Sequence, residues 1–576
     1  MVAHRALCHQ QRRTGYNART VTRCRRDPAL IHVLALVLLG AALYLPHLGT
    51  AGLLDPSEPF YPLTARQMRE SGDLLTPRLF GQPQWEKPPL TYWLILASTR
   101  LMGESEAAAR LPSALSAILL LLVTYAVGRR LFERPAVALL GSAMLAVCGK
   151  SVALGRLAFT DMTLALCVWT SVWGATLVFW GPRRPALGWL VYWAAAGAGW
   201  LTKGPVALLI PSMAVWWYAI ASNRQREIRP LQYLSGYALL AVIVVPWYTL
   251  MTAWYGTDFL YQSLVHENVR RFFIAEHSGS DRWHFYPLAV LIGLWPWSVL
   301  VPAALLRALR LARRRSAGLP EAAVLLGGLV VTSVTVLTLS KSKLASYIYP
   351  VYPALTLLAA LWLVETHRAV RHSARRRAGL AIAWVCVPLA ATAGMAVYLT
   401  RTGLTEALAP ALVCGSLLTA MGALLCRALG AKRPAAPAAA AALAAVLCVW
   451  TVYGSFLPRV EKRFSARPWA AEARQAGLGG AVSSKMCVRG VVYYTGVSHP
   501  VVVAGDGPRA WYTPHPLAVV SDTPGLLAQS GQSWPQAGYL RPKDKRMLEV
   551  SSNGRLKITE ISADTERLLV RLDPSG

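Results

Sequence analysis

Acidic residues are scarce in this sequence, which has 28 Asp and Glu side chains among its 576 residues. Several of them stand with Lys, Arg or His in short polar stretches that separate long apolar runs. A charged side chain at a membrane boundary is costly unless it is solvated, paired or functional. These stretches therefore hold the candidates for chemistry: Asp55, Glu58, Glu86, Lys87, Asp161, Lys203, His266, Arg270, Arg271 and Lys343.

This mixture of carboxylates and cations suits group transfer from a lipid phosphate. An anionic leaving group needs cations where its charge develops, and Lys and Arg supply them. An acceptor hydroxyl needs a carboxylate within hydrogen-bond reach to take its proton. A phosphate acceptor has less need of such a base, and the carboxylate would then position groups instead. The carboxylate candidates for this work are Glu58, Asp55 and Asp161.

Structural roles stay open for some of the same residues. Lys203 and Lys343 stand at the ends of apolar runs, where a long cationic side chain commonly extends to the interface. Asp161 stands at the head of a predicted helix, where a negative charge favours the helix dipole. The Glu276-His277 pair also fits an ordinary polar loop.

An acid together with a histidine indicates a further possibility, a divalent metal ion. Glu86 and His266 offer one carboxylate and one imidazole, which suit zinc, magnesium or manganese to different degrees. Two ligands predict one such ion at this place and do not select the metal.

Composition indicates lipid as the solvent for most of the chain. It is 55% hydrophobic and only 15% charged, with a mean hydropathy of +0.38, whereas soluble domains carry about 25% charged residues. The net charge of +31 would suit nucleic acid. Its positive residues, however, lie in short blocks between apolar runs, and we therefore expect no nucleic-acid partner.

Apolar stretches of about 20 residues are typical of membrane-spanning helices, and the sequence predicts thirteen. They lie near 30–47, 110–128, 136–153, 163–180, 187–201, 204–221, 232–252, 287–306, 320–339, 344–364, 379–399, 406–426 and 436–457. Lys and Arg concentrate in cytoplasmic loops. Thirteen alternating spans place every dense basic block on the side of the basic N-terminal arm, and so predict a cytoplasmic N-terminus. The break at 201–205 predicts either a tight hairpin or a kink.

This topology predicts three domains. They are a basic cytoplasmic arm at 1–27, a mainly α polytopic membrane domain at 28–458, and an external α/β domain at 459–576. The first external loop covers 48–109. Strand-like alternation appears from Gly490 and again from Leu548, and the Asn553-Gly554 pair is typical of a hairpin turn.

Seven sequence motifs occur in one order between about residues 45 and 360. The longest is Ser71-Gly-Asp-Leu-Leu-Thr-Pro-Arg-Leu-Phe-Gly-Gln-Pro-Gln-Trp-Glu86-Lys87-Pro-Pro-Leu-Thr-Tyr-Trp. The others are Arg110-Leu-Pro-Ser-Ala-Leu, Thr160-Asp161-Met, Leu201-Thr-Lys203-Gly-Pro, His266-Glu-Asn-Val-Arg-Arg271-Phe, Trp295-Pro-Trp-Ser and Ser342-Lys343-Leu-Ala-Ser-Tyr-Ile-Tyr-Pro. With these motifs the chain resembles the ArnT/PMT-like membrane glycosyltransferases of the GT-C superfamily.

The resemblance implies a GT-C fold of thirteen helices, with amphipathic loop helices and a C-terminal domain in the periplasm. It implies an undecaprenyl-phosphate-linked sugar as donor, with Lys87 and Arg271 on the carrier phosphate and Asp161 in the catalytic region. Glu86 with His266 resembles the family's metal-type site. The family's first loop opens with Asp-Glu, whereas this chain has Ser57-Glu58-Pro59. We therefore expect Glu58 as the principal acid and Asp55 as its reserve.

The leading hypothesis is thus an inverting glycosyltransferase of the bacterial inner membrane. It would be a monomer that moves a sugar from a polyprenyl-phosphate carrier to lipid A or another envelope acceptor. A transporter or lipid flippase with the same topology is the first alternative, although transporters tend to bury charges near the bilayer midplane. An enzyme that resembles the protein O-mannosyltransferases is the second. A structural scaffold for envelope assembly is the third.

Overall fold

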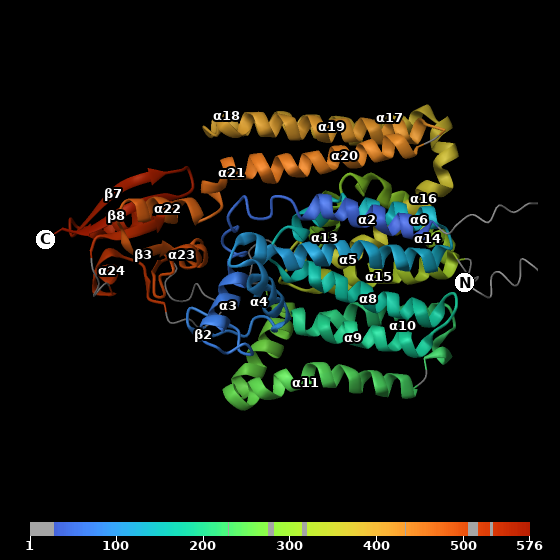
Figure 1. The fold of residues 1–576 in the computed structure, drawn as a ribbon, viewed down its shortest axis with the longest axis horizontal. Helices are drawn as coiled ribbons and strands as arrows, with labels where there is room; N and C mark the ends of the chain where they lie inside the picture. Colours follow the sequence, from blue (N-terminus) through green and yellow to red (C-terminus); the bar gives the residue numbers. More distant parts are fainter. Residues whose placement is uncertain are drawn as a thin grey trace, which may run out of the picture.

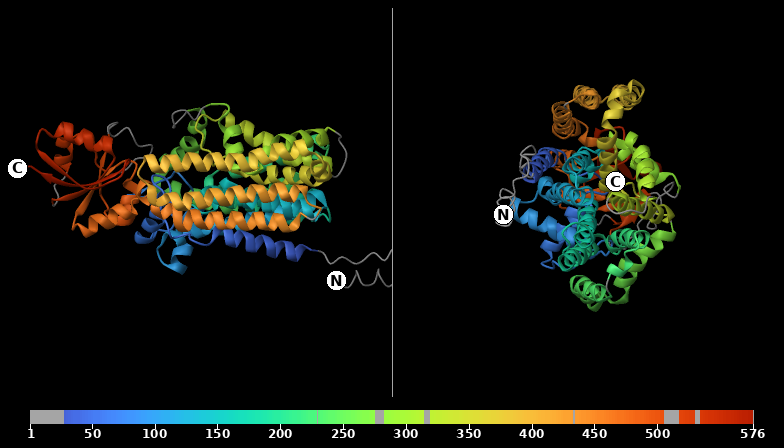
Figure 2. Two further views of the ribbon diagram at one scale, coloured as in Figure 1. Left: turned by 90° about the horizontal axis from the view of Figure 1, so that it is seen from above. Right: turned by 90° about the vertical axis from the view of Figure 1, so that its right-hand side faces the viewer.

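The chain forms a long bundle of helices that carries a small α/β domain at one end (Figures 1 and 2). This computed structural model describes residues 28–228, 230–274, 282–313, 319–432, 434–504, 517–529 and 534–575. The basic arm at 1–27 and the Glu276-His277 pair lie outside the described residues. The fold is mainly helical, as the sequence predicts.

Seven helices of the described residues are long and apolar enough to cross a membrane. They are α5 (Glu106–Phe132), α8 (Thr160–Phe179), the stretch Leu234–Phe273 around α11 (Pro230–Leu260), the stretch Pro320–Leu339 of α15 (Leu319–Leu339), Ala374–Arg401, the stretch around α19 (Leu408–Gly430), and Ala435–Arg459. Two bent pairs raise this number to at most nine. They are α6 (Pro135–Ala146) with α7 (Gly149–Gly155) and α13 (Phe285–Gly293) with the stretch through α14 (Val301–Ala312).

Four predicted spans fall outside this set of nine. They correspond to α2 (Ala29–Tyr44), α9 (Pro185–Lys203), α10 (Val206–Ala221) and α16 (Tyr352–His372). All four are helical, but α2 and α10 are shorter than a full crossing. The number thirteen therefore stays a prediction. Helices α9 and α10 pack against each other, and Gly204 between them has a φ of +87°, so the predicted break is a hairpin.

The degree of burial separates central helices from peripheral ones. In the most apolar stretch of α8, 83% of the residues are buried by the rest of the protein, whereas in Ala374–Arg401 only 11% are. That stretch includes α18 (Val387–Arg401), which lies with α19 and α20 (Ala435–Thr451) along one side of the bundle (Figures 1 and 2). Apolar surface on this side is consistent with lipid as its solvent.

The first external loop folds into α3 (Phe60–Glu70), a two-stranded turn of β1 (Arg78–Leu79) and β2 (Gln82–Pro83), and α4 (Leu90–Met102). Leu63 and Met68 on the apolar face of α3 are buried. They belong to one apolar cluster with Val488 and Val492 of the C-terminal domain. The C-terminal domain therefore packs on the first external loop.

The C-terminal domain is built on a six-stranded sheet in the order β5-β4-β3-β6-β8-β7. The strands are β3 (Gly479–Ser484), β4 (Val501–Val503), β5 (Val519–Val520), β6 (Gln536–Leu540), β7 (Leu556–Ala563) and β8 (Leu568–Pro574). Strands β5, β4, β3 and β6 are parallel to one another. Strand β8 is antiparallel to β6, and β7 is antiparallel to β8. Its helices are α22 (Arg467–Gln475), α23 (Val488–Thr495), α24 (Thr523–Gln529) and α25 (Pro542–Ser552).

Two local predictions for this domain are wrong. The segment from Gly490 is helix α23, because its apolar side chains Val488, Val491 and Val492 gather on one buried helical face. Asn553 does not begin a hairpin turn. It adopts a left-handed conformation (φ +45°) that ends α25, the position that favours Asn or Gly after a helix.

Candidate active site

A cavity of about 700 Å³ lies where the first loop, helices α7 and α8, and the C-terminal domain meet. Six cationic side chains and two carboxylates line it. The cations are Lys87, Lys150, Lys203, Arg271, Lys485 and Arg489, and the carboxylates are Glu86 and Asp161. An excess of cations in a cavity attracts anions.

A second cavity of about 240 Å³ shares Glu86, Lys87, Lys203, Arg271 and Tyr347 with the first. Apolar side chains of the membrane helices form much of its remaining wall: Leu164, Val206, Leu209, Val336 and Leu337. The shared cations therefore lie between a larger, more highly charged chamber and a smaller one whose wall includes these apolar side chains.

Asp161 and Lys203 form an ion pair at the boundary of the two cavities. Asp161 lies in the first turn of α8 and Lys203 is the last residue of α9, which ends because Gly204 adopts a positive φ. The Nζ of Lys203 is 2.6 Å from Oδ1 of Asp161 and 4.2 Å from the centre of the Tyr347 ring. The sequence places both residues at the outer ends of spans, and the structure brings them together.

Lys87 and Arg271 share one carboxylate, that of Glu267. Lys87 Nζ donates to Glu267 Oε2 at 2.9 Å, and Arg271 Nη1 donates to the same oxygen at 2.5 Å. The π-helix Tyr261–Arg270 carries Glu267, and Arg271 directly follows it. Backbone N–H groups of Lys341 and Ser342 donate to Phe272 O and Arg271 O, which ties this segment to the loop before α16.

Glu58 does not line the cavity, although the sequence indicates it as the principal acid. Its side chain is fully buried and forms a bidentate ion pair with Arg110, at 2.8 and 2.9 Å. The backbone N–H groups of Leu54 and Ala158 donate to the same carboxylate. Four donors thus occupy Glu58, so in this geometry it organises the first loop. Its catalytic role stays a prediction that this placement does not support.

Asp55 is buried between the first loop and the C-terminal domain. Arg567, which directly precedes β8, donates to its Oδ2 at 2.8 Å. Burial raises the pKa of Asp55 to about 7, against the opposing effect of the Arg567 charge. Asp55 therefore joins two domains and lies outside the residues that line the cavities.

The remaining predicted site residues separate into two groups. Glu86 lines both cavities. By contrast, Arg270 is exposed, Lys343 is only 1% exposed, and neither lines one of these two cavities. His266 is buried, with Nδ1 at 3.4 Å from Glu267 Oε1.

These residues do not complete a metal site. His266 lines neither cavity, whereas Glu86 lines both. In the described part of the chain, no three His, Cys, Asp or Glu side chains form a group suited to an ion. A divalent ion at Glu86 and His266 therefore stays a prediction, and no step of the chemistry depends on it.

Sequence reasoning missed four charged residues of the site, namely Lys150, Glu267, Lys485 and Arg489. Glu267 stands inside the His266–Phe272 motif and was recognisable as its acid. Lys150 falls within a predicted span, at the bend between α6 and α7. The apolar residues around it make this stretch read as membrane helix, so its charge did not mark it as a site residue. Lys485 and Arg489 lie more than 130 residues beyond the last of the seven motifs, which ends at Pro350.

The fold is similar to that of a protein of known structure. ArnT from Cupriavidus metallidurans superposes with a TM-score of 0.73 in its apo state, over 95% of this chain and 98% of that one, at 22% sequence identity. The same protein bound to undecaprenyl phosphate gives 0.72 at 20% identity. Residues 86–249 match the family model of the dolichyl-phosphate-mannose-protein mannosyltransferases. The chain therefore has the fold of ArnT.

Curated proteins from Pseudomonas match a little over half of the chain. The undecaprenyl phosphate-α-4-amino-4-deoxy-L-arabinose arabinosyl transferase of Pseudomonas aeruginosa strain UCBPP-PA14 is 30% identical over 348 residues, which are 58% of this chain and 60% of that protein. Transferase 1 of the same description from Pseudomonas fluorescens is 32% identical over 330 residues, 56% and 58% respectively. The match spans less than two thirds of these relatives' own length.

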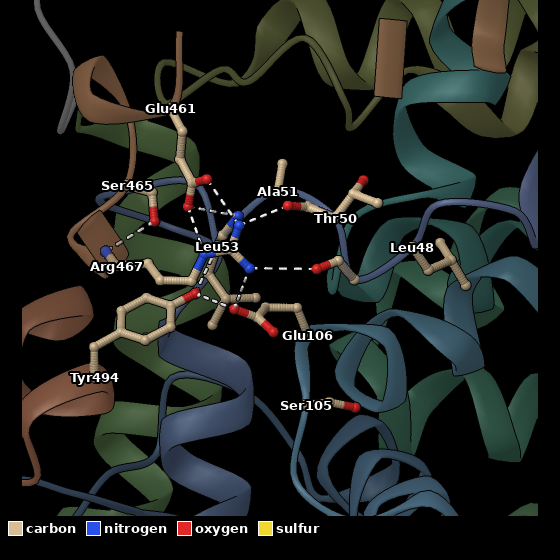
Figure 3. A network of polar contacts seen from close by, with 12 residues as sticks. Leu48, Thr50, Ala51, Leu53, Ser105, Glu106, Glu461, Ser465, Arg467 and Tyr494 are labelled. Atoms are coloured by element: carbon tan, nitrogen blue, oxygen red, sulfur yellow. Dashed lines mark hydrogen bonds and ion pairs between the residues drawn. The ribbon is translucent and has the colours of Figure 1, made fainter. Parts of the chain in front are cut away.

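In this ArnT-like fold, a polar network fixes the C-terminal domain beside the cavity (Figure 3). Arg467 of α22 pairs with both oxygens of Glu461 at 2.7 Å and reaches Glu106 of α5 at 3.1 Å. Tyr494 of α23 donates to the same Glu106 oxygen at 2.9 Å. The N–H of Gly52 in the first loop donates to Glu461. This Arg467 network joins three parts of the chain that are far apart in sequence.

Proposed function

We propose that the chain is an inverting glycosyltransferase that moves a sugar from a polyprenyl-phosphate carrier to an envelope acceptor. The observation that carries this proposal is the position of Lys87, Lys203 and Arg271 in the walls of two adjoining cavities. Eight charged side chains line the larger cavity, and apolar side chains of the membrane helices form part of the wall of the smaller one. A lipid phosphate has the same two-part chemistry, and its anionic group belongs between the two.

The smaller cavity suits the first prenyl units of the carrier, because Leu164, Val206 and Leu209 offer an apolar wall. Lys87 and Arg271, held by Glu267, face the phosphate. The larger cavity then receives the sugar and the acceptor, with space for both in its 700 Å³.

In the transfer step, an acceptor oxygen attacks the anomeric carbon on the face opposite the phosphate. The bond between that carbon and the phosphate oxygen breaks, and the phosphate leaves with the electron pair. Lys87 and Arg271 stabilise this charge as it develops. Asp161 and Glu86 are the carboxylates in the cavity wall, and either one takes the proton of an acceptor hydroxyl. Of these, Asp161 is the better oriented, because Lys203 fixes its position.

The relatives support finer statements of the same proposal. Their names specify a sugar linked to undecaprenyl phosphate, and we extend that carrier to this chain. Lipid A or another envelope glycan is the proposed acceptor. The proposed setting is the bacterial inner membrane, with thirteen spans, a cytoplasmic N-terminus, and the cavities and C-terminal domain on the periplasmic side. The enzyme would act as a monomer.

The test is a reaction with purified chain in lipid nanodiscs, given undecaprenyl-phosphate-linked sugars and an extract of envelope lipids and glycans. Release of free undecaprenyl phosphate, together with a sugar-sized mass increase on an acceptor, is the expected result. A transporter or flippase would instead move the intact donor across a liposome membrane and release no free carrier. Donor movement without cleavage would therefore contradict the proposal.

A further inference from the structure

The C-terminal domain presents one particular edge of its sheet to the larger cavity. Strand β3 ends at Ser484, and the next two residues, Lys485 and Met486, line the cavity wall. Arg489 in the first turn of α23 lines it as well. The turn between β3 and α23 is thus the part of this domain that faces the site.

This turn follows the carboxyl end of a central parallel strand. Chain order places β4 on one side of β3 and β6 on the other, so the strand order reverses at β3. In open α/β sheets, ligands bind outside the carboxyl ends of the strands at such a reversal. Here, the space next to the reversal is continuous with the cavity of the membrane domain.

Lys485 and Arg489 differ from the other cations in their position. Lys87, Lys203 and Arg271 line both cavities, whereas Lys485 and Arg489 line only the larger one. They therefore lie away from the smaller cavity, which suits the carrier lipid. An anion that reaches them belongs to a second substrate.

Arg489 keeps its charge available for a ligand. Its Nη1 donates to Pro56 O at 3.4 Å, and its guanidinium lies over the Phe60 ring at 5.1 Å. Its Nε is buried and has no hydrogen-bond partner among the described residues. Neither contact neutralises the charge, and a buried donor without a partner is costly. A bound oxyanion would pair with the charge of Arg489 and accept a hydrogen bond from its Nε.

The turn is also held in place. Asp55 accepts from Arg567 and packs against the backbone of Gly490, one residue after Arg489. The Arg467 network joins α22 and α23 to the first loop and to α5 (Figure 3). A fixed turn presents its cations at a defined distance from the transfer site, which is what selection between acceptors requires.

We propose that Lys485 and Arg489 form a subsite for an oxyanion of the acceptor, a phosphate ester or a carboxylate, so that the C-terminal domain selects the acceptor. This inference rests on the proposed function. It assigns to the domain a choice between acceptors that the donor cavity does not make.

The experiment uses the full chain in nanodiscs and measures binding of three probes. They are bisphosphorylated lipid A, an oligosaccharide of uronic acids, and undecaprenyl phosphate. The test variant is Lys485→Gln with Arg489→Gln, and Lys485→Arg with Arg489→Lys keeps both charges. The matched control is Lys557→Gln with Arg555→Gln, two exposed cations of the same domain, one on β7 and one directly before it.

The expected result is that the test variant binds one anionic probe about tenfold more weakly for each removed charge. Its binding of undecaprenyl phosphate stays within about twofold of the unmodified chain. The charge-keeping variant recovers most of the affinity, and the β7 control loses none. Weaker binding of lipid A by the test variant identifies a phosphate as the ligand. Weaker binding of the uronic acid oligosaccharide identifies a carboxylate.

Three outcomes would overturn the inference. In the first, the test variant binds both anionic probes as the unmodified chain does. In the second, the test variant loses as much affinity for undecaprenyl phosphate as for the anionic probes. In the third, the unmodified chain binds neither anionic probe. In each of them, the proposed function survives if the unmodified chain still binds and cleaves the carrier-linked donor. If the unmodified chain does not bind undecaprenyl phosphate, the proposed function itself fails.

Discussion

Glu58 and Arg110 form a buried bidentate ion pair that joins the first external loop to helix α5. The guanidinium of Arg110 also donates to the backbone carbonyls of Leu48, Ala51 and Gly52. One buried pair thus fixes the path of the segment that carries Asp55 and leads into α3. The carboxylate that the sequence favours for catalysis serves as an anchor in this structure.

We predict that Glu58→Ala acts on stability first. The substitution leaves the Arg110 charge buried without its partner, which costs about 3–5 kcal/mol. Thermal unfolding in detergent measures the loss, and transfer is then normalised to the folded fraction. We expect less than a tenfold loss of transfer per folded molecule.

Glu104→Ala provides the control for this variant. Glu104 pairs with Arg66 and Arg69 near the surface, with its side chain 32% exposed, and should cost less than about 1 kcal/mol. A Glu58→Ala protein of nearly normal stability with less than a hundredth of normal transfer would show that Glu58 acts in the chemistry after all.

Asp161→Asn should separate chemistry from binding. The variant keeps the shape of the side chain but loses the base, so turnover should fall by about 10²–10⁴. Binding of undecaprenyl phosphate should stay unchanged or become tighter, because Lys203 loses its competing carboxylate. Glu227→Gln, which alters a half-exposed ion pair with Arg183, is the control. Normal turnover in Asp161→Asn would remove this residue from the mechanism.

The raised pKa of Asp55 predicts that the stability of the protein depends on pH. Its folded pKa lies near 7, above the ordinary value of 3.8, so the folded chain holds a proton that the unfolded chain releases between these values. Stability should therefore fall as pH rises from about 4 to 7, by up to about 1 kcal/mol per pH unit from this group. Melting temperatures of the unmodified chain and of Asp55→Asn between pH 5 and pH 8 measure it.

The Asp55→Asn variant should lack this component and show a flatter profile across that range. An identical slope in both proteins would mean that Asp55 does not hold the proton.

Arg467→Ala should loosen the C-terminal domain without unfolding the membrane helices. The variant removes charge-assisted hydrogen bonds to Glu461 and Glu106, which are worth about 2 kcal/mol together. Hydrogen exchange should become faster in the first loop and in α22. Arg571→Ala, which breaks an exposed pair with Asp573, should leave exchange there unchanged. Equal exchange in both variants would contradict a holding role for the Arg467 network.

The sequence predicts the helices of the bundle and four charged residues that line the larger cavity, for a physical reason. Hydropathy identifies apolar runs without any long-range contact, and Lys87, Asp161, Lys203 and Arg271 interrupt or end these runs where a charge is conspicuous. The structure places all four in the wall of the larger cavity.

Burial and long-range pairing were not predictable in the same way. The partner of Glu58 lies 52 positions away, and nothing in the sequence shows that the carboxylate faces inward. The segment from Gly490 alternates β-branched and aromatic residues and resembles a strand. Tertiary packing instead buries one face of it as a helix against α3. That misreading also concealed Arg489 as a site residue.

The central claim is that Lys87 and Arg271 hold the phosphate of the carrier lipid, and neighbouring arginines test it most directly. Arg271 lines both cavities, whereas Arg270 is exposed and lines neither. Binding of undecaprenyl phosphate to the full chain should weaken about tenfold in Arg271→Gln and by a similar factor in Lys87→Gln. It should stay within about twofold in Arg270→Gln. Equal affinity in Arg271→Gln and the unmodified chain would contradict the account.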